Sequence, residues 1–321
     1  MGAFGLQTHI WNNNLKSILL LAGFPFLLVL LLYGLSVAFV VLNGDVTSVG
    51  GGLSLAADHV ARLWPFALLG AAVWFGIAWL FYQTMIEAAV GARGLTRKEA
   101  PDLYNLLENL CVSRGLRTPK INIIETPALN AFASGLSEKS YKVTVTRGLL
   151  ETLDRDELEA VLAHELTHIM NRDVRLLIIA VIFVGIFSFF GEMIFRNAFR
   201  SGVRVGGYTR SRKGDSRGGG ILILIAALIV IIAYLLALVI RFTLSRKREY
   251  LADAGAVELT RNPDAMISAL RKISGRSKIN APNDIQQMMI ENDARFAGIF
   301  ATHPPIEKRI EALTKFAGGR E

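Results

Sequence analysis

Long apolar segments alternate with segments of mixed polarity along the chain. Four of them, roughly 17–42, 63–82, 176–195 and 221–240, stay apolar over about 20 residues, the length at which an α-helix crosses a bilayer. The fourth, ILILIAALIVIIAYLLALVI, carries no charge. The first is too long to be a removable signal peptide, and no small-residue cleavage site follows a short apolar stretch in it. The pattern therefore predicts four transmembrane helices, with the first retained as an anchor.

Shorter periodic patterns fill the two mixed segments, about 83–173 and 241–321. Helices are predicted over 101–113, from Asp154 onward, between Asn262 and Gly275, and over 306–315, and strands over 121–125 and 141–146. Asp154 followed by Glu157 is a capping-box pattern, in which each side chain accepts from backbone N–H groups of the first turn. The predicted fold class is an integral membrane protein, mainly α with a small β-sheet (α+β).

A polar linker separates the third and fourth apolar segments. Residues 196–220 contain seven Gly and seven Lys+Arg and almost nothing that could be buried. Such a composition favours a solvated, mobile loop over a contact with lipid headgroups or substrate.

Composition supports a membrane protein. Hydrophobic residues make up 52% of the chain and the mean hydropathy is +0.40, which is too apolar for an ordinary soluble enzyme. The formal charge of +8 is typical of cytoplasmic loops rather than of a nucleic-acid-binding surface, so no nucleic-acid partner is expected. A single cysteine, Cys111, excludes an intrachain disulfide and an all-thiolate metal site.

The stretch AVLAHELTHIMNRD, residues 160–173, contains the strongest chemical motif. His164 and His168 are four residues apart, so on a helix both imidazoles share one face and can bind a single ion. Glu165, one residue round the helix, can reach a water on that ion and act as general base. The alternative is a pair of structural histidines, which is a rarer origin for an HExxH sequence on a helix. The motif therefore predicts a zinc site, with one ion in each chain.

A catalytic zinc needs a third protein ligand. Asn171 and Val174 stand where an extended metzincin motif would have Gly and His, so that layout is excluded. The remaining candidates are Glu249, Glu258 and His303.

Glu249 is favoured because a helical hairpin between His168 and Glu249 would return the chain to the side it left. Asp253 follows one turn after Glu249, where it can accept the other ring N–H of a zinc-bound histidine.

Five segments together resemble a known family, the membrane-embedded HtpX-type zinc metalloproteases, which are related to the CAAX prenyl proteases. They are NAFASG (130–135), VTVTRGLL (143–150), DELEAVLAHELTHIMNRD (156–173), the REYLAD segment ending at Asp253, and THPPIEKRI (302–310). The resemblance implies a zincin-like catalytic domain with zinc on His164, His168 and Glu249, and Glu165 as catalytic base. It also implies an endopeptidase that acts on misfolded or membrane proteins in protein quality control.

The same resemblance suggests further site residues. Asn130, Ala131, Phe132 and Ala133 would form an edge strand to which an extended substrate adds by backbone pairing. His303 would either donate to the oxyanion of the tetrahedral intermediate or only brace a loop. Arg309 is expected to be a structural salt-bridge partner.

The predicted organisation follows the four apolar segments. It comprises an N-terminal membrane hairpin (1–90), a first catalytic part (91–175), a second membrane hairpin with its Arg/Gly-rich loop (176–240), and a second catalytic part with the third ligand (241–321). One Arg lies in the loop 43–62, whereas Arg93, Arg97 and Lys98 follow the second segment, which favours a cytoplasmic catalytic domain at the cell membrane.

Two other functions stay open at the level of sequence. One is a site-specific processing protease of the CAAX type, which would cut at a single defined site. The other is a non-catalytic membrane scaffold that retains a metal, whose function would survive Glu165→Gln. The natural substrates and the oligomeric state have no sequence signal.

Overall fold

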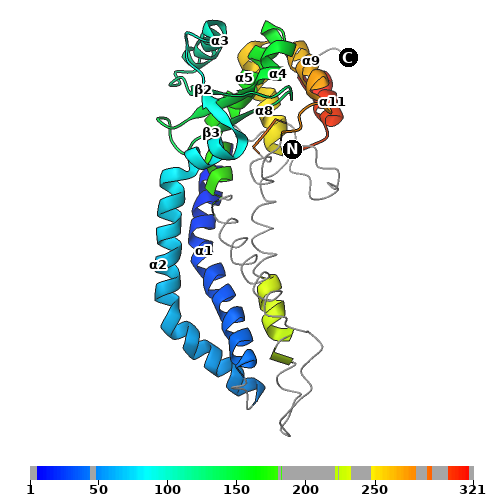
Figure 1. The fold of residues 1–321 in the computed structure, drawn as a ribbon. Coiled ribbons are helices and arrows are strands. Elements are labelled where there is room, and N and C mark those ends of the chain that lie inside the picture. The colour runs from blue at the N-terminus through cyan, green and yellow to red at the C-terminus, as the bar shows by residue number, and fades with distance from the viewer. Residues whose placement is uncertain are drawn as a thin grey trace. The chain divides into compact units, whose positions relative to one another are not determined.

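The computed structural model describes residues 6–43, 48–179, 182, 221–222, 224–232, 247–279, 288–290 and 303–317. These residues divide between two compact units. One, here called the α/β unit, comprises Met1–Ser17, Leu80–Val181 and Phe242–Glu321, and the other, the helical unit, comprises Ile18–Trp79 and Ile182–Arg241. The mainly helical fold with a small sheet is as predicted (Figure 1).

Two long helices, α1 (Leu6–Leu42) and α2 (Val49–Val90), supply most of the described residues of the helical unit. Their packing within that unit is apolar and includes part of the segment 221–232. The buried residues of this cluster are Val37, Val40, Val41, Ala56, Leu222 and Ala226. Tyr33 on α1 donates its hydroxyl to the backbone carbonyl of Leu53 at 3.3 Å, which satisfies a polar group beside the cluster.

The described residues contain two helices that are long and apolar enough to cross a membrane. They are Ala22–Val41, with a mean hydropathy of 2.5, and Val49–Val90, with 1.8. Large apolar side chains such as Phe66 and Leu69 are exposed on α2, as suits a helix surrounded by lipid. Residues 180–181, 183–195, 223 and 233–240 of the predicted spans 176–195 and 221–240 lie outside the described residues, so a count of four stays a prediction.

Helix α2 is longer than the span predicted at 63–82. It begins at Val49, where the hydroxyl of Ser48 accepts from the backbone N–H of Gly51 at 3.0 Å and so caps the first turn. The following turns continue the apolar pattern through the predicted loop.

A four-stranded sheet forms the β part of the α/β unit, in the order β1-β2-β4-β3. Its strands are β1 (Ala92–Gly94), β2 (Lys120–Ile124), β3 (Ala131–Ser134) and β4 (Lys142–Thr146). Strands β2 and β4 are parallel, whereas β1 with β2 and β3 with β4 are antiparallel. Strand β3 therefore lies at one edge of the sheet. The strands predicted at 121–125 and 141–146 are confirmed within one residue.

Helices pack against one another and against this sheet in the α/β unit (Figure 1). They are α3 (Pro101–Val112), α4 (Arg147–Thr152), α5 (Arg155–Met170), α8 (Lys247–Thr260), α9 (Pro263–Ile273) and α11 (Ile306–Ala317). The predicted capping box at the start of α5 is confirmed, because Asp154 and Glu157 each accept from the other's backbone N–H. The side chain of Asn262 caps α9 by accepting from the backbone N–H of Ala265. Local sequence signals thus set where these helices begin.

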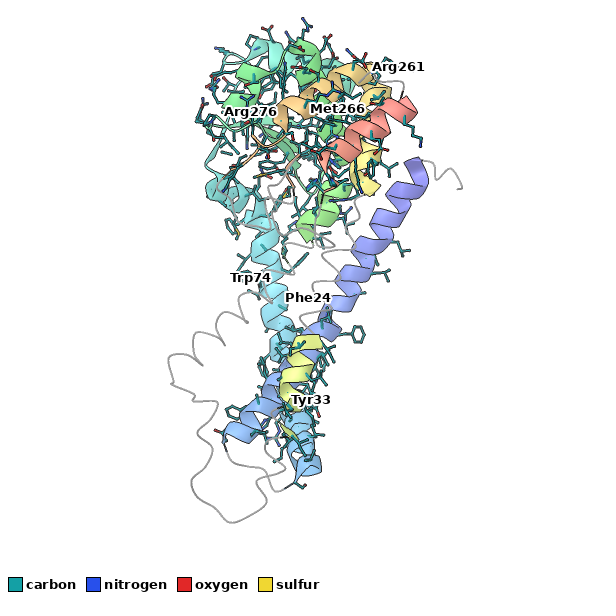
Figure 2. All side chains as sticks on the ribbon, turned by 90° about the vertical axis from the view of Figure 1, so that its right-hand side faces the viewer. Phe24, Tyr33, Trp74, Arg261, Met266 and Arg276 are labelled. Carbon is teal, nitrogen blue, oxygen red and sulfur yellow. The ribbon has the colours of Figure 1, made fainter. Side chains whose placement is uncertain are left out.

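Helix α9 shows how the unit buries its apolar faces. Met266 is fully buried, whereas Arg261 and Arg276, on either side of the helix, are exposed (Figure 2). Ser268 and Lys272 of the same helix donate to the buried carboxylate of Glu157 on α5, each at 2.6 Å. The helix that carries the HExxH sequence is therefore held at its first turn by hydrogen bonds and packing together.

Candidate metal centre

Helix α5 carries both histidines of the HExxH sequence. His164 is fully buried and the side chain of His168 is 12% exposed. Their Nε2 atoms lie 3.2 Å apart, so the two rings converge one helical turn apart, as the spacing predicts.

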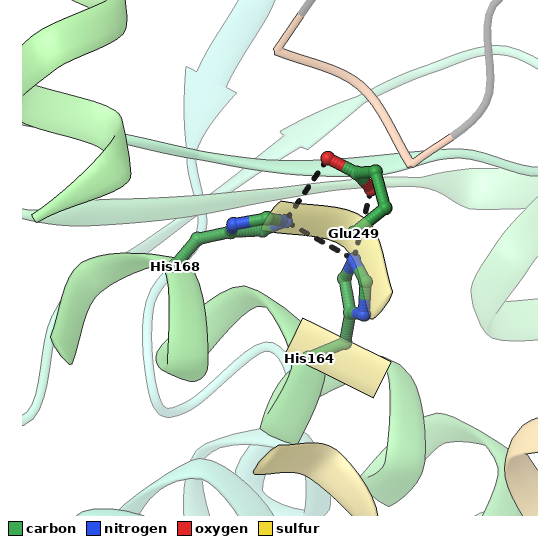
Figure 3. Close-up of side chains that lie close together, drawn as sticks. All are labelled: His164, His168 and Glu249. Carbon is green, nitrogen blue, oxygen red and sulfur yellow. Dashed lines mark hydrogen bonds and ion pairs between the residues drawn. The ribbon is translucent and has the colours of Figure 1, made fainter. Parts of the chain in front are cut away.

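Helix α8 brings in Glu249 from beyond the second predicted hairpin. Its Oε2 lies 3.6 Å from His164 Nε2 and its Oε1 lies 3.7 Å from His168 Nε2 (Figure 3). The three side chains form a group whose possible ligand atoms all lie within 4.8 Å of one another. Glu258, the other acidic candidate, instead pairs with Arg114 at the surface, at 2.6 Å.

The close approach of α8 to α5 depends on Gly255. A Cβ at this position would lie 2.5 Å from Cγ2 and 2.7 Å from Oγ1 of Thr167. Thr167 cannot easily move aside, since its hydroxyl donates to the carbonyl of Ala163 at 2.8 Å. The helix that carries Glu249 therefore comes this close to the histidines only because residue 255 has no side chain.

A carboxylate fixes the orientation of each imidazole. Asp253 Oδ1 lies 3.0 Å from His164 Nδ1, and Asp173 Oδ2 lies 3.0 Å from His168 Nδ1. A proton on each Nδ1 leaves both Nε2 lone pairs directed at the common point between the rings.

Sequence reasoning proposed Asp253 for this role but missed Asp173. The signal was present in HIMNRD, five residues after His168. It was not decisive because the contact depends on a turn after α5, in which Arg172 adopts φ 59°.

The donor set fits a small divalent cation in a tetrahedral site. Ligands about 2.0–2.1 Å from zinc at tetrahedral angles lie about 3.4 Å from each other. The three separations of 3.2, 3.6 and 3.7 Å are close to that value. Two imidazole nitrogens and a carboxylate oxygen are also ligand types that zinc accepts.

Glu165 lies beside this group and is 1% exposed. Burial raises the pKa of its carboxyl above the usual range, although the nearby histidines oppose the shift. The backbone N–H of Ala133 also opposes the shift, and Oε2 of the carboxylate has no hydrogen-bond partner among the described residues. A buried carboxyl with a raised pKa and a free oxygen can take up a proton.

The charges of the ligand side chains depend on each other. Burial would raise the pKa of Glu249, but His303 and His168 outweigh it and hold that pKa well below the usual range. Burial would likewise lower the pKa of His168, but the charge of Glu249 and the hydrogen bond to Asp173 raise it to about 10. A cation at this site therefore displaces a proton from the histidine.

His303 and Arg309 both lie in this charge cluster. His303 Nδ1 is 3.2 Å from Glu249 Oε2. Arg309 is fully buried and binds Asp253 through two hydrogen bonds, Nε to Oδ2 at 2.8 Å and Nη2 to Oδ1 at 2.6 Å. Arg309 is thus a salt-bridge partner of the carboxylate that orients His164.

The segment 130–133 forms the edge strand expected from the resemblance, with β3 running from Ala131 to Ser134. Asn130 is fully buried, and its amide group donates to the carbonyl of Ser277 at 2.8 Å. Strand β3 packs against α5, and the backbone N–H of Ala133 lowers the pKa of the catalytic candidate Glu165 in part. The edge of the sheet and the metal centre are therefore in contact within one unit.

Comparisons with known proteins find a matching family, curated relatives and a solved structure. The model of Peptidase family M48 matches residues 97–317. A protein named Protease HtpX homolog from Bacteroides fragilis is 47% identical over 326 residues, covering 97% of this chain and 99% of its own. One of the same name from Listeria monocytogenes is 38% identical over 317 residues, covering 96% and 99%. The crystal structure of S. mikatae Ste24p is 20% identical with a TM-score of 0.47, covering 78% of this chain and 58% of its own.

Proposed function

The chain belongs to peptidase family M48 and is a metal-dependent peptidase, and on that premise we propose that it is a membrane zinc endopeptidase with its active site at the HExxH helix. One observation carries the proposal. The Nε2 atoms of His164 and His168 and the carboxylate of Glu249 converge within 4.8 Å, directly beside Glu165.

We propose that His164, His168 and Glu249 hold the zinc ion. When bound there, zinc supplies a Lewis acid that polarises the scissile carbonyl and acidifies water. Asp253 and Asp173 keep the protons of the histidines on Nδ1, so both Nε2 atoms are available as ligands.

Glu165 is the proposed general base. It accepts the proton of the attacking water and later donates it to the nitrogen of the leaving amine. Its raised pKa supports both steps, because a carboxyl whose pKa lies closer to neutral pH can both take up and release a proton during the reaction. His303, close to Glu249, is proposed as a donor to the oxyanion that develops on the substrate carbonyl.

Substrate is proposed to bind as an extended chain on the outer edge of β3. The position of β3 at the end of the strand order and its contact with Glu165 support this docking. Proteins and peptides are the substrate class, and the proposed physiological targets are misfolded and membrane proteins. Docking through the backbone suits such varied targets because it reads no side chain.

The proposed location is the cell membrane, in a multi-pass arrangement with the catalytic domain facing the cytoplasm. The apolar helices Ala22–Val41 and Val49–Val90 support membrane attachment. The orientation rests on the positive residues that follow the second apolar segment, namely Arg93, Arg97 and Lys98.

Glu165→Gln tests the proposal. The substitution keeps the shape of the side chain and removes the base, so kcat for casein and for a casein-derived peptide should fall about 10²- to 10⁴-fold. Zinc content, measured by mass spectrometry on detergent-purified protein, should stay at one ion per chain. Treating wild-type protein with a chelator should abolish cleavage, and added zinc should restore it.

Glu159→Gln is the matched control, since Glu159 lies on the same helix and is only half-buried. It should cleave at the wild-type rate. Cleavage by Glu165→Gln at the wild-type rate would refute the proposed base, and a metal-loaded wild type that cuts nothing would favour a scaffold. One unique cut in a proteome digest, instead of many, would favour a site-specific processing protease.

A further inference from the structure

Strand β3 exposes backbone groups to its free edge only at alternate residues. In an antiparallel pair, residues that bond to the partner strand alternate with residues whose N–H and C=O point away from it. Thr146 donates to the carbonyl of Asn130 at 3.1 Å, so Asn130 points toward β4. With Ala131 opposite Val145 and Ala133 opposite Val143, the outward-facing residues of β3 are Ala131 and Ala133.

The outward groups of Ala131 are already bonded to the protein itself. The backbone N–H of Ile290 donates to the carbonyl of Ala131 at 3.0 Å and to Oδ1 of Asn130 at 3.1 Å. The N–H of Ala131 donates to the same Asn130 oxygen, also at 3.0 Å. Ile290 thus occupies the backbone position that a docking chain would take opposite Ala131.

Ile290 is firmly held in that position. Its side chain is 2% exposed, and those of Met288 and Met289 are also buried. Its carbonyl accepts from Nη1 of Arg309 at 2.9 Å. Arg309 in turn binds Asp253, the partner of His164, so the segment 288–290 is tied to the metal centre.

At its other end, β3 does not continue as an extended edge. The strand ends at Ser134, and Gly135 follows with a φ of 133°, so the backbone leaves the extended conformation there. Between the two ends lies Ala133, whose N–H faces the carboxylate of Glu165 closely enough to lower its pKa in part. No donor among the described residues contacts the carbonyl of Ala133 from outside the sheet.

We infer that Ile290 is a built-in stop on the edge strand, which leaves the carbonyl of Ala133 as the single backbone acceptor for substrate and so fixes the register of the cleaved chain beside Glu165. The inference rests on the proposed docking of substrate to β3. In it, Asn130 and Arg309 are positioning residues: they hold the stop and do not touch the substrate.

Methylation of backbone nitrogens in a substrate tests this register. A peptide spanning a mapped casein cleavage site would be made as a series, each member methylated at one backbone nitrogen other than that of the scissile bond. Wild-type enzyme should show one sensitive position, where kcat/KM falls about tenfold or more because the N–H that donates to Ala133 is lost. Methylation two residues to either side should change kcat/KM less than about threefold.

Ile290→Ala should loosen the stop by removing its buried anchor while keeping its backbone. A second sensitive position should then appear two residues from the first, as substrate pairs with Ala131. Ile121→Ala is the matched control, because Ile121 is equally buried but lies on β2, which β4 separates from β3. It should keep a single sensitive position.

Two sensitive positions, two residues apart, in the wild-type enzyme would overturn the stop while supporting edge-strand docking. No sensitive position at all would overturn both, yet cleavage that Glu165→Gln abolishes would still support the peptidase. If Ile290→Ala does not fold, the number of sensitive positions in the wild-type enzyme alone decides whether Ile290 acts as a stop.

Discussion

Two ion-pair networks in the α/β unit are built alike and differ in burial. At the metal centre, Arg309 binds Asp253 at 2.6 Å with side-chain exposures of 0% and 3%. At the edge of the sheet beside β1, Arg93 binds Glu99 at 3.0 Å with exposures of 48% and 43%. The distance between two charged groups therefore does not tell a buried, structurally important ion pair from one on the protein surface.

Burial decides what each network can do. The exposed charges interact through water and are screened by salt, so their pairing contributes little to stability. The buried charges have no water to replace a lost partner, so each holds the others in place. At the metal centre, Arg309 lowers the pKa of Asp253 and Asp253 raises the pKa of Arg309, although burial opposes both shifts. At the surface, hydrogen bonds to Glu99 and Glu125 raise the pKa of Arg93.

The largest expected effect is that of Asp253→Asn. The change leaves the guanidinium of Arg309 buried without its carboxylate, which should lower the free energy of unfolding by about 3–5 kcal/mol. It also removes the carboxylate that orients His164, so zinc affinity should fall about 10- to 100-fold. Thermal unfolding in detergent and zinc competition with a chromophoric chelator measure the two effects.

Asp156→Asn is the control for this change, since Asp156 is exposed on the same helix as the histidines. It should leave both the unfolding midpoint and the zinc affinity as they are. Equal effects from the two substitutions would mean that burial does not separate the networks.

Ser268→Ala should have an intermediate effect. Its hydroxyl donates to Glu157 at 2.6 Å, and Glu157 is 2% exposed but keeps Lys272 as a second partner. Loss of one hydrogen bond to a buried charge should cost about 1.5–3 kcal/mol in the free energy of unfolding. Ser137→Ala, at an exposed turn, should change the unfolding midpoint negligibly, and a drop as large as that of Ser268→Ala would contradict the comparison.

Glu99→Gln should have the smallest effect. Hydrogen bonds from Thr96, then from Arg93, lower the pKa of Glu99 from 4.5 to about 2. Because the pKa is lowered on folding, any stability that Glu99 contributes is complete above pH 4.5 and is lost as the pH falls through about 2. Unfolding midpoints of variant and wild type should agree closely at pH 7 and converge further toward pH 2; a large gap at pH 7 would contradict this.

Local signals in the sequence predicted most helix starts. Asp154 with Glu157, Pro101 and Asn262 act within one helical turn, so the sequence alone contains the information. Strand β1 was missed because a three-residue Ala-Arg-Gly strand has no alternating pattern to detect. Its pairing with β2 is a tertiary effect that no local window contains.

The candidate site divides in the same way. The spacing of His164 and His168 places both side chains on one helix face, so the sequence alone predicts that they can share an ion. Glu249 lies far along the chain, and its place at the site follows only from how the chain returns from the membrane. The link from Arg309 to both Asp253 and Ile290 joins segments that are far apart in the chain. Such a link follows from tertiary packing. The sequence predicts that Arg309 forms a salt bridge but does not predict with which residues.

Gly255 gives the site an unusual kind of fragility. The residue carries no functional group, yet any side chain there would collide with Thr167 and wedge α8 away from α5. Glu249 therefore reaches the two histidines only because residue 255, on the same helix, has no Cβ. Position 255 should therefore tolerate substitution as poorly as a metal ligand does, although glycine itself binds no ion.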